Sequence, residues 1–435
     1  MKPQVQELLR FIEASPTCFH AVENIAKALT EAGFARLNEG EPWKLEPGRG
    51  YFVTRNNSAV IAFSLPQEHR GGYHIIASHS DSPTFKIKDV AELEGPGEYL
   101  RLNTERYGGM ICSTWMDRPL SIAGRALVLE DGAIRTRLVE FGQVVIPNLA
   151  IHFNRKINDG YAYDAHVDMV PLFSQGGGKD SFRAQLAQAA GVEPEQLLSS
   201  DLFLACKQPG TVWGPQEEFL SCPRLDDLEC AFASLQAFLS AQHPQQGSVN
   251  LCCVFDNEEV GSGTKQGADS TFLEDVLRRI HAALGKDADA YYQDVARSFM
   301  LSADNAHAVH PNHPAITDSG NCVKMNGGVV VKFNANQKYT TDGVSAAVFR
   351  QVCQKAGVPC QSFANRSDLP GGSTLGNISN AHVSLNTVDI GLAQLAMHSS
   401  CETAGTDDVD YMVRAMRAFY ETAIDIQVDG TVRLG

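Results

Sequence analysis

The chain has 435 residues, with 36 Lys and Arg against 51 Asp and Glu, a formal net charge of −15. This length exceeds that of a usual single-core domain, so we expect two domains or one domain with a large insertion. Hydrophobic residues make up 43% and charged residues 20% of the chain, as in soluble globular proteins. The acidic balance argues against nucleic acid or an anionic membrane as the main partner.

The N-terminus and the cysteines bear on the compartment. Residues 1–7 lack the apolar core and the small-residue cleavage site of a signal peptide, and no window of about 18 apolar residues exists that would span a membrane. The 11 cysteines are odd in number, lie mostly in apolar runs and form no CxxC pair. This pattern favours reduced core thiols over a disulfide framework or a thiolate zinc site, and we expect a cytoplasmic protein.

The first 90 residues predict a helix followed by strands. The helical pattern runs from about residue 15 to 33, with a proline early in its first turn and a glycine just past its end. Strands are expected at residues 50–54, 59–63 and 73–78. The last strand runs directly into His79-Ser80-Asp81, whose outer side chains point to one face if the chain stays extended. One can then bind a metal while the other orients it, the alternative being an ordinary turn.

The sequence pattern changes from about residue 91 to 216. Residues 126–129 and 134–138 read as a β-hairpin, residues 154–180 as a long loop and residues 181–191 as a short helix. The block separates two halves of an α/β pattern. We therefore expect an inserted β-rich domain within a discontinuous catalytic domain of residues 1–90 and 217–435.

Asp226 and Asp227 precede a strongly apolar helix predicted for residues 228–241. Aspartates at a helix start commonly cap it and complement its dipole. The alternative is that a carboxylate held there bridges two cations. The motif by itself favours the cap.

Two adjacent glutamates follow the next apolar run. Residues 251–255 predict a buried parallel strand, and Glu258 and Glu259 come almost directly after its carboxyl end, where open α/β sheets bind ligands. Two neighbouring like charges are unfavourable unless a positive group lies beside them. A metal cluster would supply that charge, with one glutamate as ligand and the other free as general base. The alternative is a solvated surface turn.

Further strand ends carry polar residues. A strand at 300–303 ends at Asp304, and His307 and His310 follow it either as ligands or as part of a polar loop. Lys332 lies late in a strand at 327–333, either as an edge-strand gatekeeper or as a buried charge that awaits an anion. The remaining predicted elements are helices at 270–284, 343–357 and 407–426 and strands at 360–363 and 382–388.

Polar residues from widely separated strand ends would meet at one edge of a mostly parallel sheet. Two histidines and three carboxylates, one of them bridging, would complete a pair of zinc ions with open positions for water and substrate. Oxygen and nitrogen ligands also suit Co²⁺ or Mn²⁺. One glutamate remains to deprotonate water. The set comprises His79, Asp81, Asp226, Glu258, Glu259, Asp304 and His398.

Seven motifs in this order resemble the aspartyl aminopeptidase family of dinuclear zinc exopeptidases over essentially the whole chain. They are H-S-D-S-P (79–83), R-L-D-D-L (224–228), D-N-E-E-V-G-S (256–262), S-A-D-N-A-H-A-V-H-P-N (302–312), K-F-N-A-N-Q-K-Y (332–339), D-L-P-G-G-S-T-L-G (368–376) and A-M-H-S (396–399). The resemblance implies an α/β fold with a mixed, mostly parallel sheet flanked by helices and with an inserted β-rich domain.

The resemblance also implies a role for each site residue. Asp226 would bridge the metals and would be followed by a cis peptide bond. His79 and Glu259 would bind one ion, and Asp304 and His398 the other. Asp81 would orient His79, and Glu258 would be the general base.

Specificity and assembly are implied as well. Lys332 matches the family's substrate-pocket lysine, a partner for an acidic first side chain. His152 matches a histidine of the inserted domain that reaches the site of a neighbouring subunit. Family members form dodecamers built from dimers through the inserted domain. The chain departs from the commoner family forms in H-S-D for H-T-D, in D-D for D-N after Asp226, and in W-M-D-R-P-L (115–120) for W-F-D-R-D-L.

The leading hypothesis is a zinc aminopeptidase that removes an N-terminal residue, preferably Asp or Glu, from peptides. An aminopeptidase of neutral-residue preference and a related dinuclear zinc deacylase or carboxypeptidase are alternatives within enzymes. A non-catalytic oligomeric scaffold is the alternative from another class. The ligand set together with the spare Glu258 argues against the scaffold.

Overall fold

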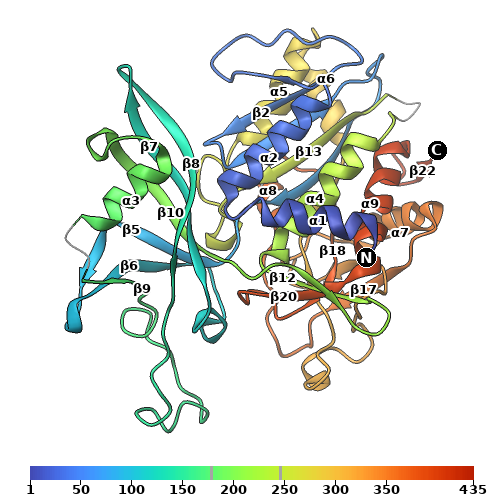
Figure 1. Ribbon diagram of the computed structural model, residues 1–435. Coiled ribbons are helices and arrows are strands. Elements are labelled where there is room, and N and C mark those ends of the chain that lie inside the picture. The colour runs from blue at the N-terminus through green and yellow to red at the C-terminus, as the bar shows by residue number, and fades with distance from the viewer. Residues whose placement is uncertain (177–179, 244–246) are drawn as a thin grey trace.

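The computed structural model describes residues 1–176, 180–243 and 247–435 (Figure 1). Its largest sheet has nine strands in the order β1-β2-β3-β13-β4-β14-β18-β16-β17. Their bounds are β1 Ala35–Arg36, β2 Gly50–Arg55, β3 Ala59–Ser64, β4 Tyr73–His79, β13 Val249–Phe255, β14 Phe299–Ala303, β16 Val329–Phe333, β17 Cys360–Ala364 and β18 Asn386–Gly391.

The centre of this sheet is parallel. Strands β13, β4, β14 and β18 are neighbours that run in one direction, whereas β3 and β16 pair antiparallel on either side of them. The carboxyl ends of β13, β4 and β14 therefore lie at one edge, which is where His79 ends β4 and where Asp256 and Asp304 follow β13 and β14. The prediction of a mixed, mostly parallel α/β sheet flanked by helices is confirmed.

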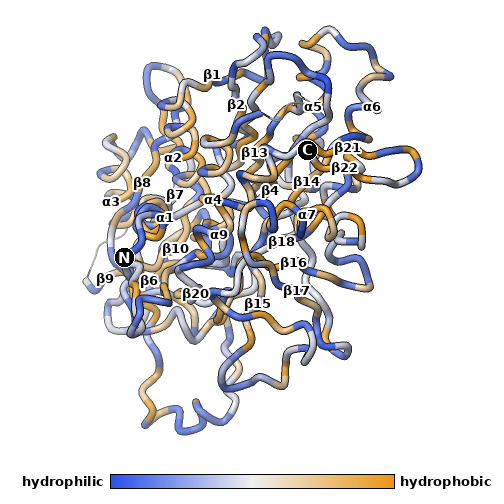
Figure 2. Tube along the Cα trace, turned by 90° about the vertical axis from the view of Figure 1, so that its right-hand side faces the viewer, coloured by the Kyte–Doolittle hydropathy of each residue, from blue (hydrophilic) through white to orange (hydrophobic). Residues whose placement is uncertain are grey.

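Helices cover both faces of the sheet because its central strands are apolar on both sides. Alternate residues of β13 enter opposite cores: Cys252 and Val254 lie in one, and Leu251 and Cys253 in the other. Figure 2 shows hydrophobic residues along these central strands. The helices are α1 Pro3–Glu13, α2 Cys18–Glu31, α4 Leu225–Ser240, α5 Phe272–Ala283, α6 Ala288–Ala296, α7 Gly343–Ala356, α8 Leu375–Ser379 and α9 Thr406–Glu421.

A second sheet of six strands lies beside the first, in the order β8-β7-β10-β5-β6-β9 (Figure 1). Its pairs are antiparallel and include the predicted hairpin between β7 and β8. It has a hydrophobic core of its own, to which α3 (Ser181–Ala190) contributes. The strands are β5 Thr84–Glu94, β6 Tyr99–Tyr107, β7 Leu120–Glu130, β8 Ala133–Val144, β9 Leu172–Gln175 and β10 Leu197–Cys206.

Smaller elements complete the fold. A five-stranded sheet has the order β11-β12-β20-β19-β15, and β21 pairs with β22. None of the helices in the described part of the chain combines the length and apolar character needed to cross a bilayer. The elements are β11 Thr211–Trp213, β12 Phe219–Cys222, β15 Ala306–His307, β19 Ala393–Leu395, β20 Glu402–Gly405, β21 Ile424–Ile426, β22 Val432–Leu434, and 3-10 turns at Pro96–Glu98, Cys112–Trp115 (η2), Pro194–Gln196, Glu258–Val260 (η4) and Pro314–Ile316.

Several predictions of secondary structure were wrong. The segment 154–180, expected as a long loop, contains β9 (Leu172–Gln175), and its residues 177–179 lie outside the described residues. The strand expected at residues 382–388 begins at Asn386, because α8 and the turn after it occupy the preceding residues. The closing helix ends at Glu421 rather than residue 426, because Ile424–Ile426 pairs with β22 instead.

Gly391 lies where the sheet carries Asp304, and its close packing yields a test of the fold. A Cβ there would lie 2.1 Å from the Asp304 carbonyl oxygen. We expect Gly391→Ala to lower stability by about 1–3 kcal/mol through overpacking. Gly343→Ala is the matched control, since a Cβ there meets nothing within 4 Å. Thermal unfolding of the two variants checks this, and equal melting temperatures would contradict it.

Candidate metal centre

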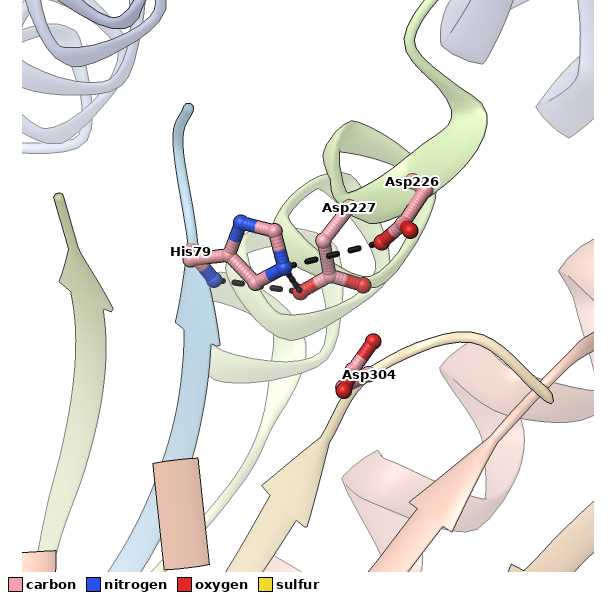
Figure 3. Close-up of side chains that lie close together, drawn as sticks. All are labelled: His79, Asp226, Asp227 and Asp304. Carbon is pink, nitrogen blue, oxygen red and sulfur yellow. Dashed lines mark hydrogen bonds and ion pairs between the residues drawn. The ribbon is translucent and has the colours of Figure 1, made fainter. Parts of the chain in front are cut away.

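Seven acidic and histidine side chains from several elements lie close enough together to bind the same metal ions. They form three overlapping groups whose donor atoms lie within 4.8 Å of one another. Figure 3 shows His79, Asp226, Asp227 and Asp304 around one such point. The groups are His79 with Asp226, Asp227 and Asp304, then His79 with Glu258 and Glu259, and finally Asp226 with Glu259 and His398.

The break at the start of α4 gives Asp226 its position. Asp226 and Asp227 have non-helical backbone angles, so regular helix begins at Leu228, as predicted. The peptide bond between the two aspartates is cis, as the resemblance implies. Both aspartates lie in the acidic first turn of α4, where their charges complement the helix dipole. The Asp227 carboxylate also accepts a hydrogen bond from the backbone amide of His79, at 3.1 Å, which ties the helix start to the end of β4.

The spacing of the donor atoms fits ligands of a shared ion. Asp226 lies between the two histidines, with His79 Nε2 at 3.5 Å from Oδ1 and His398 Nε2 at 3.4 Å from Oδ2. His398 Nε2 is also 3.4 Å from Glu259 Oε2. These distances exceed the ~2.7–2.9 Å of a charged hydrogen bond. They match the ~3.3–3.4 Å that separates two ligands each ~2.0–2.1 Å from a tetrahedral zinc ion.

Buried acceptors without partners support the same interpretation. Within the described residues, Asp226 Oδ1, Asp227 Oδ1 and Glu259 Oε1 are buried and accept no hydrogen bond. Buried carboxylate oxygens are normally satisfied, because leaving one unpaired is strongly unfavourable. Five carboxylates against two imidazoles in the cluster also leave an excess of negative charge. The residues present therefore fit bound divalent cations.

The pKa values of the cluster reflect that excess. Burial raises the pKa of Glu258 to about 8, and burial together with the charge of Asp226 raises the pKa of Glu259. Burial alone would lower the pKa of His398, but Asp226 outweighs it and raises the pKa to about 9. A dication at the centre would reverse both kinds of shift by favouring carboxylates and neutral imidazoles.

The donor groups reflect only part of the ligand pairing expected from the resemblance, because His79 groups with Glu259 as expected but also with Asp304. Asp304 groups with His79, and His398 groups with Glu259, each group sharing Asp226. No donor group among the described residues joins Asp304 to His398. The physical reason is that β14 and β4 are adjacent in the sheet and place Asp304 beside His79, whereas His398 approaches Asp226 from another side.

Asp81 holds residues of the metal centre in place without being one of the donors. His79 Nδ1 donates to the Asp81 carbonyl at 3.1 Å and lies 3.4 Å from its carboxylate, so Nε2 faces the cluster. The Asp81 carboxylate also accepts the backbone amides of Glu258 and Glu259, at 3.1 and 3.2 Å. One residue thus fixes both a histidine and the adjacent glutamates.

Glu402 is a supporting residue that sequence reasoning missed. Its buried carboxylate accepts the backbone amides of Asp226 at 3.0 Å and His398 at 2.7 Å. Burial raises its pKa to about 8. It follows His398 by four residues without any motif of its own, so only the contacts reveal it.

Lys332 lines a cavity of about 210 Å³ together with His307, Tyr339, Thr374 and five of the seven donors, namely Asp226, Glu258, Glu259, Asp304 and His398. Lys332 is 2% exposed, and its ammonium donates to the Asp304 carbonyl at 2.8 Å. The buried-charge interpretation of this lysine is therefore correct and the gatekeeper interpretation wrong. His307 lines the cavity without joining a donor group among the described residues, and His310 lies in the loop beyond it.

His152 lies apart from these residues. It is exposed in the long segment between β8 and β9 and is not among the described residues that line the cavity. Its neighbour Phe153 is 81% exposed. A site role for His152 within the same chain has no support in this arrangement.

Comparison with known proteins agrees with the site. Residues 11–420 match the family model described as aminopeptidase I zinc metalloprotease (M18). The chain belongs to the M18 family of zinc metallo-aminopeptidases. It is 43% identical over 424 residues to the probable M18 family aminopeptidase 2 of Clostridium novyi strain NT, which covers 95% of this chain and 98% of that protein. The Ectopseudomonas mendocina protein of the same name is 41% identical over 428 residues, covering 96% and 98%.

Solved structures resemble the chain equally broadly. The structure titled as the Ape4 and Nbr1 complex superposes with a TM-score of 0.93 at 36% identity and covers 96% of this chain and 85% of that one. The S. cerevisiae mApe1 dodecamer superposes with a TM-score of 0.85 at 30% identity, covering 95% of each chain. This membership of M18 agrees with the resemblance found in the sequence.

The two hydrogen bonds of Glu402 generate a test. Glu402→Gln replaces one acceptor oxygen by an NH₂ group that faces a backbone N–H donor. We expect zinc affinity to fall about 10- to 100-fold, the usual effect of losing such a supporting partner. Glu274→Gln is the control, because that glutamate pairs with Arg278 on the surface of α5. Zinc competition with a chelator measures both variants, and equal affinities would refute the role of Glu402.

Proposed function

We propose that this M18 enzyme is an aminopeptidase that removes N-terminal Asp or Glu from peptides, with Glu258 as general base. The observation that carries the proposal is one cavity lined by Glu258, by the buried cation Lys332 and by four of the proposed ligands, Asp226, Glu259, Asp304 and His398. Family membership favours an aminopeptidase over the deacylase, carboxypeptidase and scaffold alternatives.

Two zinc ions per chain fit the donor groups, with Co²⁺ or Mn²⁺ as substitutes. His79, Asp226 and Asp304 would hold the first ion, and Asp226, Glu259 and His398 the second. Asp226 would belong to both ligand sets, because its two carboxylate oxygens face different histidines. Asp227 would not be a ligand and would keep its hydrogen bond to the His79 amide. Glu258 would not be needed as a ligand either.

The proposed reaction is hydrolysis of the first peptide bond. Bound zinc supplies Lewis-acid polarisation of the scissile carbonyl and lowers the pKa of water. Glu258 accepts a proton from the attacking water as the new C–O bond forms, and it passes the proton to the amine nitrogen as the C–N bond breaks. Asp81 holds Glu258 in place through its backbone amide, at 3.1 Å.

Lys332 supports the preference for acidic residues. Burial would lower the pKa of Lys332, but its interactions, first with the charge of Asp304, outweigh burial and raise the pKa, so the ammonium stays charged. A buried cation beside the donors suits a carboxylate side chain. One observation favours the neutral-residue alternative: the ammonium lies 3.4 Å from Asp304 Oδ2, which already offsets part of its charge.

We also propose that residues 91–216 form an inserted domain that makes dimer contacts, within a catalytic domain of residues 1–90 and 217–435. The separate six-stranded sheet supports an inserted domain, although β5 begins at Thr84, before residue 91, and β11 (Thr211–Trp213) pairs in the five-stranded sheet. A homo-oligomer, a dodecamer built from dimers, is supported by the mApe1 dodecamer and by exposed apolar side chains near His152, namely Leu149, Ile151 and Phe153. His152 would then reach the site of a neighbouring subunit. The free state of all the cysteines supports a reducing compartment such as the cytoplasm.

Glu258→Gln tests the general base. The amide cannot accept the proton from water, so we expect kcat to fall about 10²- to 10⁴-fold. Zinc content should stay unchanged, because Glu258 is not required as a ligand. Steady-state kinetics together with metal analysis checks this. Near-normal turnover by the variant would exclude Glu258 as the base.

Aminoacyl chromogenic substrates test specificity. We expect chelator-sensitive release of Asp and Glu at least about tenfold faster than of Leu, Ala or Lys, because one charge-assisted contact contributes about 1.5–3 kcal/mol. Lys332→Met should remove this preference, whereas Lys338→Met, at an exposed site in the same segment, should keep it. Fastest release of Leu would favour the neutral-residue alternative. No release from zinc-loaded protein would contradict the proposed function.

A further inference from the structure

The segment of residues 107–114, here called the strap, connects β6 to η2 and thus belongs to the six-stranded sheet. It nevertheless runs directly against the metal centre of the nine-stranded sheet. None of its residues is a candidate ligand. Its contacts with the ligands are made largely by backbone atoms and glycines, which carry no sequence motif for metal chemistry.

The strap orients His398. The Nδ1 atom of His398 lies 2.7 Å from the Gly109 carbonyl oxygen, and the Ile111 amide donates to the His398 carbonyl at 3.0 Å. A carbonyl oxygen can only accept, so Nδ1 carries the hydrogen. Nε2 is therefore the ring nitrogen that faces Asp226 and Glu259, each 3.4 Å away.

Gly108 packs against the other ligand of the same group. Its φ is +76°, and a Cβ there would lie 3.1 Å from Glu259 Cβ and 3.5 Å from Glu259 Oε2. A side chain at this position would therefore press on Glu259 itself. Glycine is needed here both for its backbone conformation and for the space that it leaves.

Tyr107 connects the strap to the glutamate loop. Its hydroxyl donates to Asp81 Oδ2 at 2.7 Å and accepts from Asn257 Nδ2 at 2.8 Å. Asp81 in turn accepts the backbone amides of Glu258 and Glu259. Tyr107 thus fixes the loop that carries both glutamates.

The far end of the strap is anchored beside His398 as well. Ser400 donates its amide to Thr114 Oγ1 at 3.0 Å and its hydroxyl to the Thr114 carbonyl at 2.6 Å. Tyr107 and Thr114 therefore hold the strap at both ends, with Gly108 and Gly109 against the ligands between them.

We propose that the strap is the positioning element for the metal ion held by Asp226, Glu259 and His398, so that the six-stranded sheet sets the affinity for this ion. The inference rests on the two-ion assignment of the proposed function. The other ion differs, because His79 takes its orientation from the Asp81 carbonyl on its own chain segment. A substitution at Gly108 should therefore weaken the binding of one ion and leave the binding of the other unchanged.

A matched pair of glycine substitutions tests this. Gly108 has φ +76° and Gly132, in the β7–β8 turn of the same sheet, has φ +75°, but a Cβ at Gly132 meets nothing within 4 Å. Gly108→Ala and Gly132→Ala therefore share the backbone penalty and differ in the contact with Glu259. The full-length proteins are titrated with Zn²⁺ against a chromophoric chelator, and the Co²⁺-loaded forms are compared by absorption spectroscopy.

We expect Gly108→Ala to lower the affinity for one of the two zinc ions about 10- to 100-fold, as loss of supporting contacts does. The absorption spectrum of the Co²⁺-loaded form should change as well. Gly132→Ala should bind both ions as the unaltered chain does. Equal binding by the two variants would overturn the inference and leave the proposed function standing. A chain that loses one ion through Gly108→Ala yet cleaves no aminoacyl substrate would support the inference and contradict the proposed function.

Tyr107→Phe keeps the inference testable if Gly108→Ala fails to fold. It removes only the hydroxyl that contacts Asp81 and Asn257. We expect kcat to fall about 10- to 100-fold with little change in KM, because the glutamate loop loses its anchor while the cavity keeps its shape. Unchanged kcat and unchanged zinc affinity would overturn the role of Tyr107 and of the strap.

Discussion

The carboxylate of Asp226, buried between two imidazoles, is the constraint on which this molecule depends. Five carboxylates and two histidines converge there, and this excess of negative charge favours cations among them. The parallel order of β13, β4 and β14 brings their carboxyl ends to one edge and so creates this concentration of charge. The broken start of α4 then places Asp226 over that edge.

Supporting contacts make the arrangement specific. Asp81 fixes His79 and the glutamate loop, and Glu402 fixes the backbone of Asp226 and His398. The Gly109 carbonyl orients the ring of His398. Each of these groups acts on a ligand without binding an ion, as metal sites generally require. Both large sheets therefore contribute to one centre.

Much of the fold and the donor set could be predicted from sequence, because strand ends and helix starts leave local patterns. His79, Glu259 and Asp304 follow apolar runs and were grouped with Asp226 and His398 from their positions in the chain, and the resemblance added a role for each. The pairing of ligands could not be predicted, because chain order does not say which carboxylate faces which imidazole. The strap and Glu402 were missed for a related reason: backbone carbonyls, glycines and an isolated glutamate acquire their roles only through tertiary contacts.

The central claim is that two ions share Asp226. Anomalous diffraction at the zinc edge from crystals of the zinc-loaded protein tests it most directly. The account predicts two peaks per chain, one among His79, Asp226 and Asp304 and the other among Asp226, Glu259 and His398. A single peak, or two peaks that do not share Asp226, would contradict it.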